Sequence, residues 1–315
     1  MSESINFSHY SVLLKESVDA IDPEHGGVFA DLTLGGGGHS LEILKRMADG
    51  SRLIAVDQDK DAIAASKVRL HDYLDRVTFV NDNFSNIASA LEELGIESLD
   101  GAVIDLGVSS YQLDTPERGF SYMHDAPLDM RMNRDTGISA YDIINTYDRD
   151  SLKKIIFEYG EEKFAPRIAA KIAEARKVCP IKTTFELVDI IRSAMPDGGR
   201  GGEKHPAKRT FQAIRIEVNR ELEVIEPAIR SVVSYLKPGA RLAVITFHSL
   251  EDRLVKNIFS DMANPCTCPK NFPVCVCGKK PVAKLYTRKP ILPGENELSE
   301  NSRSRSAKLR IAEKL

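Results

Sequence analysis

The sequence predicts an α/β fold with a mostly parallel, Rossmann-like sheet. Short apolar runs alternate with helical patterns four times between residues 28 and 106, which is typical of a parallel sheet covered by helices on both faces. The first apolar run ends in four consecutive glycines. The alternation stops after residue 112 and resumes near residue 208. We therefore predict a sheet domain formed by residues 1–112 and 208–315, with residues 113–207 inserted as a helical domain.

The glycine run, Gly35–Gly38, lies between a predicted strand at residues 28–34 and a helical pattern that starts at His39. Glycine permits positive φ and lets a ligand approach backbone N–H groups, and a helix N-terminus adds unpaired donors. This arrangement favours a nucleotide-type ligand with an anionic or carboxylate group. The dinucleotide fingerprint requires a third glycine three residues after the second. Ser40 and Leu41 occupy that place in the two registers, which counts against NAD or FAD.

Polar or aromatic residues follow the other predicted strands. Asp57 follows residues 53–56, Phe84 lies shortly after residues 77–80, and Asp105 lies at the end of a fourth strand. Because the carboxyl ends of parallel strands meet at one edge of a sheet, we expect one site there. Asp57 would bind ribose hydroxyls, Phe84 would stack on an adenine, and Asp105 would bind the polar end of the ligand. The structural alternatives are helix capping for the two aspartates and a core position for Phe84.

The remaining elements are predicted mainly from apolar spacing. A stripe from Phe211 to Leu236 predicts one long helix with a kink at Pro227. Ser249 and Asp252 fit a capping box on a later helix. Further helices are expected at residues 9–21, 60–70, 87–94, 140–145, 152–159, 168–178 and 185–194, and further strands at residues 242–247 and 308–311.

Composition predicts a soluble globular protein: 42% of the 315 residues are hydrophobic and 28% are charged. The polar start and the absence of a long apolar run predict a cytoplasmic protein without a membrane segment. The net charge is −3, but residues 270–315 contain eleven lysines and arginines against four glutamates. This asymmetry predicts a basic face toward a polyanion. An ordinary solvated surface is the alternative.

Four of the five cysteines cluster as two C-x-C pairs. An odd total with this crowding is unlike a secreted disulfide framework. Four thiolates on a short loop could close a tetrahedral zinc site, and reduced free thiols are the alternative. The predicted zinc ligands are Cys266, Cys268, Cys275 and Cys277.

Over nearly its whole length the sequence resembles the bacterial 16S ribosomal RNA cytosine-N4 methyltransferases, which use S-adenosylmethionine. The resemblance rests on several long motifs. They are residues 9–16, the glycine loop with His39-Ser40, Asp57, Asp105-Leu106-Gly107-Val108-Ser109-Ser110 with Gln112-Leu113-Asp114, residues 118–121, 127–131, 160–162, 205–207, 209–213 and 247–253.

The resemblance implies a class I methyltransferase sheet whose helical insert helps to recognise the substrate. It implies methyl transfer from S-adenosylmethionine to the N4 amine of a decoding-site cytidine in 16S ribosomal RNA of the small subunit. By the family pattern the cofactor contacts fall on Gly37, Gly38, His39, Asp57, Phe84, Asp105 and Gln112, and the glycine-loop interpretation adds Gly35.

Methyl transfer to an exocyclic amine mainly requires positioning, together with a hydrogen-bond acceptor held against an amine N–H. Ser109 and Ser110 are the predicted catalytic residues, with a tight structural turn as the alternative. RNA phosphates are expected near Lys204, Lys208, Arg209 and Arg215. Two other functions stay open, a non-enzymatic ribosome-assembly or RNA-binding factor and a nucleotide-dependent oxidoreductase. A small-molecule methyltransferase is a further alternative, and a homodimer is also left open.

Overall fold

The computed structural model describes residues 11–196, 205–269, 274 and 276–315. The chain forms two compact units, one of Met1–Gly107 with Leu222–Leu315 and one of Val108–Glu221. The predicted insert, residues 113–207, lies entirely within the second unit. The second unit also takes in helix α10 (Lys208–Asn219), because the apolar side of α10 packs into the core of that unit.

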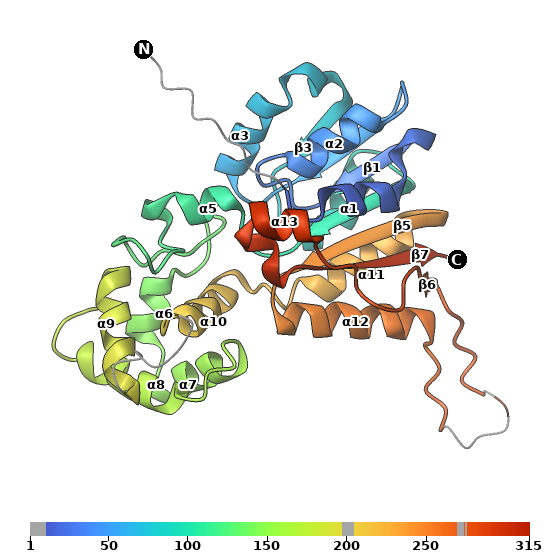
Figure 1. Ribbon diagram of the computed structural model, residues 1–315. Helices are drawn as coiled ribbons and strands as arrows, with labels where there is room; N and C mark the ends of the chain where they lie inside the picture. Colours follow the sequence, from blue (N-terminus) through green and yellow to red (C-terminus); the bar gives the residue numbers. More distant parts are fainter. Residues whose placement is uncertain (1–10, 197–204, 270–273, 275) are drawn as a thin grey trace, which may run out of the picture. The chain divides into compact units, whose positions relative to one another are not determined.

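The first unit is built on a seven-stranded sheet of order β3-β2-β1-β4-β5-β7-β6. Strand β7 runs antiparallel to both of its neighbours, and the other pairs are parallel (Figure 1). The strands are β1 Val28–Asp31, β2 Arg52–Val56, β3 Val77–Val80, β4 Leu99–Asp105, β5 Leu236–Thr246, β6 Ala283–Leu285 and β7 Lys308–Lys314. The predicted strands are confirmed. Strand β6 was not predicted, because three residues are too few for a pattern that stands out from a loop.

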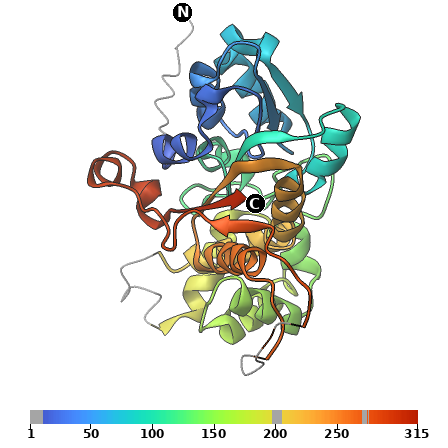
Figure 2. The same ribbon diagram turned by 90° about the vertical axis from the view of Figure 1, so that its right-hand side faces the viewer.

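Helices cover both faces of this sheet, as Figure 2 shows from a second direction. Side chains alternate along a strand, so Phe29 and Leu53 face one core while Ala30 and Ile54 face the other. Each fully buried Leu, Ile or Phe of this kind contributes about 1.5–3 kcal/mol to folding. The first core receives α1 Leu14–Ile21, α2 Gly38–Arg46 and α3 Lys60–Arg69, and the second receives α4 Ile87–Glu93, α11 Ile225–Tyr235 and α12 Ser249–Ala263.

The second unit is helical and has its own apolar core. Reciprocal capping boxes start three of its helices, with Ser109 paired to Gln112, Ser139 paired to Asp142 and Thr183 paired to Glu186. Its helices are α5 Ser110–Asp114, α6 Ala140–Thr146, α7 Arg149–Glu158, α8 Ala165–Ala175, α9 Thr184–Ala194 and α10. The predicted helices from residue 140 to residue 194 are therefore confirmed within a few residues at their ends.

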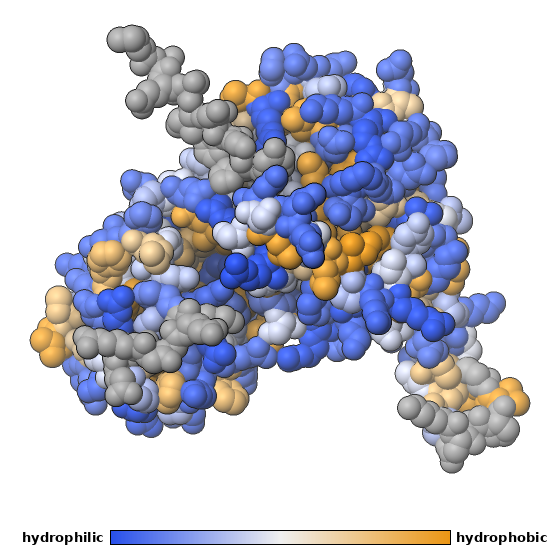
Figure 3. Space-filling model, in the orientation of Figure 1, coloured by the Kyte–Doolittle hydropathy of each residue, from blue (hydrophilic) through white to orange (hydrophobic). Residues whose placement is uncertain are grey.

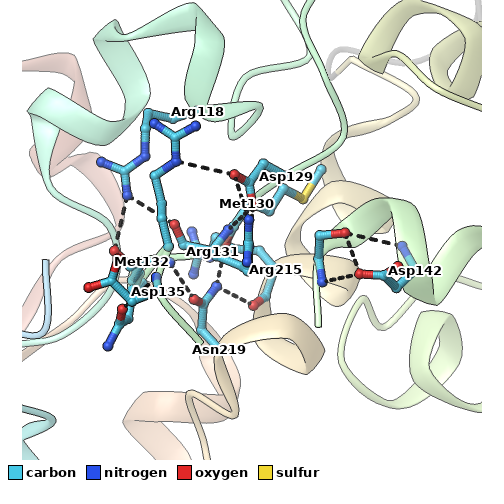
Figure 4. Close-up of polar contacts among 12 residues, drawn as sticks. Arg118, Asp129, Met130, Arg131, Met132, Asp135, Asp142, Arg215 and Asn219 are labelled. Atoms are coloured by element: carbon cyan, nitrogen blue, oxygen red, sulfur yellow. Dashed lines mark hydrogen bonds and ion pairs between the residues drawn. The ribbon is translucent and has the colours of Figure 1, made fainter. Parts of the chain in front are cut away.

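A polar network fixes the irregular segment between α5 and α6 (Figure 4). The Asn219 side chain accepts from the Met132 backbone N–H at 2.7 Å and donates to the Met130 carbonyl at 2.8 Å. Arg118, only 1% exposed, donates to the carbonyls of Arg131 and Met132. These bonds satisfy buried backbone groups that no strand or helix pairs, and they hold Met130 at a φ of 59°.

Two sequence predictions about helices are wrong. The stripe from Phe211 to Leu236 forms two helices, α10 and α11, separated at Arg220, whose φ is 52°. Pro227 lies in the first turn of α11, where a proline breaks no intrahelical hydrogen bond. The capping box of α12 consists of His248 and Glu251 rather than Ser249 and Asp252. Among the described residues, no helix has the length and apolar composition to cross a membrane.

Candidate cofactor site

The glycine loop connects β1 to α2 through left-handed backbone conformations. Gly35 has a φ of 48° and Gly37 a φ of 73°, a region that costs little only for glycine. The Gly35 N–H donates to Asp57 Oδ2 at 2.8 Å, and the Gly35 carbonyl accepts from Ser66 Oγ at 2.8 Å. The end of β2 and helix α3 therefore hold the loop in place.

Gly38 lies against the segment that precedes α1. A Cβ at Gly38 would lie 1.8 Å from Ser11 Oγ, so no larger residue fits there without displacing Ser11. His39 is buried beside it, and its Nε2 donates to the Val12 carbonyl at 3.2 Å. Its Nδ1 lies 3.8 Å from Asp105 Oδ2. Burial lowers the pKa of His39, so the ring is neutral and Nδ1 is an acceptor.

Asp31 ends β1 and is fully buried. Its two oxygens accept from Ser40 Oγ at 2.7 Å and from the Thr33 N–H at 3.1 Å. Thr33 Oγ1 in turn accepts from the Asp105 N–H at 2.6 Å. No role for Asp31 was predicted, although a carboxylate four residues before the glycine run was a usable signal.

Asp105 ends β4 near several other carboxyl groups. Its Oδ1 atom is buried and has no hydrogen-bond partner among the described residues. Burial, with the nearby carboxylates of Asp31, Glu251 and Glu297, raises the pKa of Asp105 well above its usual value. A buried acceptor without a partner is costly. The position therefore suits a ligand that brings a cationic or hydrogen-donating group.

Asp57 lies at the end of β2. Its second oxygen, Oδ1, accepts from the Asp59 N–H at 2.8 Å. Burial raises the pKa of Asp57 to about 7, although the backbone bonds from Asp59 and Gly35 oppose that shift. At the end of β3, Asn81 Nδ2 donates to the Asp57 carbonyl at 2.9 Å. Phe84 is half-buried and packs against the apolar core on one face of the sheet, so its ring forms a wall near these strand ends.

Three predicted site residues belong to the helical unit. Ser109 is the N-cap of α5: its Oγ accepts from the Gln112 N–H at 3.2 Å, and Gln112 Oε1 accepts from the Ser109 N–H at 3.0 Å. The Ser109 carbonyl accepts from the Leu113 N–H. The hydroxyl oxygen and the carbonyl oxygen of Ser109 therefore both accept hydrogen bonds from the first turn of the helix. For the Ser110 side chain, no hydrogen bond is found within the described part of the chain.

The basic residues predicted to meet RNA differ in their surroundings. Lys208 and Arg209 are exposed on α10. Arg215 donates to both oxygens of Glu221 at 2.8 and 2.9 Å, so a phosphate would have to compete with this ion pair. Lys204 lies outside the described residues. In the first unit, Lys308 and Arg310 pair with Asp252, so part of the basic C-terminal charge is neutralised within the chain.

The helical unit has a shallow pocket of about 210 Å³. The rings of Tyr122 and His205 stack there with centroids 4.4 Å apart, and Phe211 contacts Tyr122 edge-on. Burial and Arg192 lower the pKa of His205, so this imidazole is also neutral. The lining residues are Tyr122, Met123, Phe185, Val188, Asp189, Arg192 and His205.

The sheet order with antiparallel β7, the glycine loop and the acidic strand ends together define a class I methyltransferase. The chain belongs to the MraW methylase family, whose sequence model matches residues 6–315.

Two relatives carry the name ribosomal RNA small subunit methyltransferase H. The Clostridium botulinum protein (strain Kyoto / Type A2) is 56% identical over 311 residues, 99% of this chain and 100% of that protein. The Lachnospira eligens protein is 53% identical, with 99% of each chain covered. A solved structure of an rRNA methylase from Streptococcus thermophilus is 11% identical with a TM-score of 0.44, covering 98% of this chain and 99% of that one. At that level of similarity, the fold assignment rests on the strand order of this chain itself.

Proposed function

We propose that this protein transfers a methyl group from S-adenosylmethionine to the N4 amine of a decoding-site cytidine in 16S ribosomal RNA of the small subunit, in the cytoplasm. The observation that carries the cofactor assignment is the buried, unpartnered Asp105 Oδ1 beside the glycine loop. S-adenosylmethionine has an ammonium group and a sulfonium centre, which suit a site rich in carboxylates. A dinucleotide would instead bring a pyrophosphate into the field of Asp31, Asp57 and Asp105.

The described residues fit the proposed cofactor in three ways. Asp105 Oδ1 and His39 Nδ1 offer acceptors to the ammonium group. Asp57 offers carboxylate lone pairs to ribose hydroxyls, and Phe84 offers an apolar wall to the adenine. The left-handed conformations of Gly35 and Gly37 and the close packing of Gly38 set the course of the loop, and the backbone N–H groups at the start of α2 suit the carboxylate of the cofactor. Gln112 is proposed as a further contact on the pattern of the family.

The bound cofactor would supply an activated methyl group for an in-line displacement. The protein must then hold the cytosine amine with its lone pair aimed at that methyl group. We assign this to the Ser110 hydroxyl, which could accept one amine N–H, while Ser109 positions α5 through its capping box. Exclusion of water from around the amine would strengthen the hydrogen bond between the amine and the Ser110 hydroxyl. Zinc has no role in this proposed step.

The helical unit offers features suited to RNA. Exposed Lys208 and Arg209 could contact phosphates. The pocket beside Tyr122 and His205 combines flat aromatic rings with a guanidinium group, a combination that binds unpaired bases by stacking. The first unit adds exposed cations at Lys279, Lys280, Arg288 and Lys289. These features support a folded RNA substrate over a small molecule.

The competing proposal is a non-enzymatic assembly factor with a methyltransferase-like fold. A scaffold has no need for a buried carboxyl oxygen that, like Asp105 Oδ1, has no hydrogen-bond partner among the described residues, because such an atom costs stability. One assay distinguishes the two proposals. Small subunits are isolated from cells that lack this protein and are incubated with the purified protein and labelled S-adenosylmethionine. The RNA is then digested to nucleosides. Labelled N4-methylcytidine supports the enzyme. Tight subunit binding without label would support the assembly factor.

A further inference from the structure

The described residues between α12 and β6, which are 264–269, 274 and 276–282, form an extension that reaches away from the sheet (Figure 1). None of its described residues is buried. Figure 3 shows apolar surface on the extension. Val274 is 70% exposed and Val276 is 72% exposed. One backbone bond, from the Val282 N–H to the Met262 carbonyl, closes its base. A segment of this size without a core needs another source of order.

Three cysteines of this extension lie together. The sulfur atoms of Cys266, Cys268 and Cys277 all lie within 4.8 Å of one another, and the Cys266 and Cys277 sulfurs are 3.9 Å apart. Zinc–thiolate bonds of about 2.3 Å in a tetrahedral site place neighbouring sulfurs about 3.8 Å apart. The observed spacing is close to that value and far longer than the roughly 2.05 Å of a disulfide.

The surroundings of the sulfurs also favour a thiolate site. The Val276 N–H donates to Cys268 Sγ at 3.3 Å, and a hydrogen bond of this kind holds a metal ligand in place. Cys268 and Cys277 are half-buried, while Cys266 is exposed, so a metal ion could enter from solvent. Cys275, the fourth cysteine of the predicted set, lies outside the described residues.

We propose that Cys266, Cys268 and Cys277 bind a structural zinc ion that orders this extension. Each thiol loses its proton to solvent on binding, so uptake of zinc releases protons and strengthens as pH rises. The three thiolates supply three of the four positions of a tetrahedral site. This proposal is independent of the proposed methyl transfer, because its ligands lie outside the cofactor site.

The test begins with metal analysis of the full-length protein, purified under reducing conditions without chelators. We expect about one zinc ion per chain in the wild type. Cys266→Ser, Cys268→Ser and Cys277→Ser should each retain much less zinc. Cys179→Ser, which removes an exposed cysteine of the helical unit, is the matched control and should keep the full amount.

A second measurement avoids dependence on variants that fold poorly. Zinc-free wild-type protein, prepared with a strong chelator, is titrated with cobalt(II) and followed by absorption. A thiolate-to-cobalt charge-transfer band with visible bands typical of tetrahedral cobalt is expected, together with slower proteolytic cleavage within residues 264–282. Absence of zinc and of the cobalt bands, a mass change that shows a disulfide instead, or equal zinc in all four variants would overturn the proposal.

Discussion

The Asp57 carboxylate at the end of β2 accepts a hydrogen bond from the Gly35 backbone N–H at 2.8 Å. This bond ties the glycine loop after β1 to the neighbouring strand. The same carboxylate is the one proposed to bind the ribose of the cofactor. One side chain therefore shapes the loop and contacts the ligand, and its charge should affect both.

Asp57→Ala should weaken binding of S-adenosylmethionine. Hydrogen bonds to a charged group contribute about 1.5–3 kcal/mol, so the affinity should fall tenfold or more by calorimetry. Glu93→Ala, which removes an exposed carboxylate of α4, is the control and should bind normally. Unchanged binding in a folded Asp57→Ala protein would contradict the assignment of Asp57.

Cofactor affinity should depend on pH near neutrality. The folded-state pKa of Asp57 is raised to about 7, so raising the pH from about 6 to 8 ionises it and should strengthen binding. Near pH 7 binding should therefore release protons, which calorimetry in two buffers of different ionisation enthalpy measures. Asp57→Asn should lose this contribution. A cofactor affinity that falls with rising pH would argue against this role of Asp57.

The same pKa shift predicts an effect on stability. The native state binds more protons than the unfolded chain between the unfolded pKa of about 3.9 and the folded value. The contribution of Asp57 to stability should therefore decline as pH rises through that window and stay level above it. Denaturant unfolding of the wild type and Asp57→Asn across this range measures the difference. Parallel pH profiles for the two proteins would show that Asp57 does not titrate in this way.

Ser110→Ala should impair catalysis, whereas Ser109→Ala should impair stability. Ser110→Ala should lower the rate of methyl transfer without changing cofactor affinity, because its proposed contact is to the amine. Ser109→Ala removes an N-cap and should mainly destabilise α5, by about 0.5–2 kcal/mol. Single-turnover kinetics and thermal melts separate the two effects. A fully active Ser110→Ala enzyme would remove Ser110 from the mechanism.

Lys208→Ala and Arg209→Ala should weaken binding to small-subunit RNA and leave cofactor affinity unchanged. If each residue contacts one phosphate, the slope of log affinity against log salt should become shallower by about one for each. Lys154→Ala, on the exposed side of α7, is a matched control. Binding that is indifferent to salt would favour a small-molecule methyltransferase.

Most of the sheet could be predicted from the sequence, because alternating strands and helices carry strong local signals. Val77–Val80 was predicted at its observed bounds. The separation of α10 from α11 could not be predicted, because the apolar spacing continues through Arg220 and the left-handed turn there depends on tertiary packing. The short elements β6, α5 and α13 (Glu295–Glu300) carry too few residues for a periodic pattern.

The site was only partly predictable. The glycines and the carboxylates at strand ends follow from topology, so Asp57 and Asp105 could be placed. The buried role of Asp31 depends on its hydrogen bonds with Thr33 and Ser40, and that of Glu251 depends on the exact position of the helix cap. Glu251 accepts from the Phe247 and His248 N–H groups, one residue away from the predicted cap. The ion pair between Arg215 and Glu221 likewise follows from the turn after α10, which apolar spacing does not reveal.

The proposed methylation of one cytidine in 16S ribosomal RNA can be tested by mass analysis of nucleosides from a decoding-site fragment of that RNA. Cells with the protein, cells without it and cells with the Asp105→Asn variant are compared. We expect N4-methylcytidine in the first sample and its loss or strong reduction in the other two. An identical N4-methylcytidine content with and without the protein would show that the protein does not methylate this cytidine.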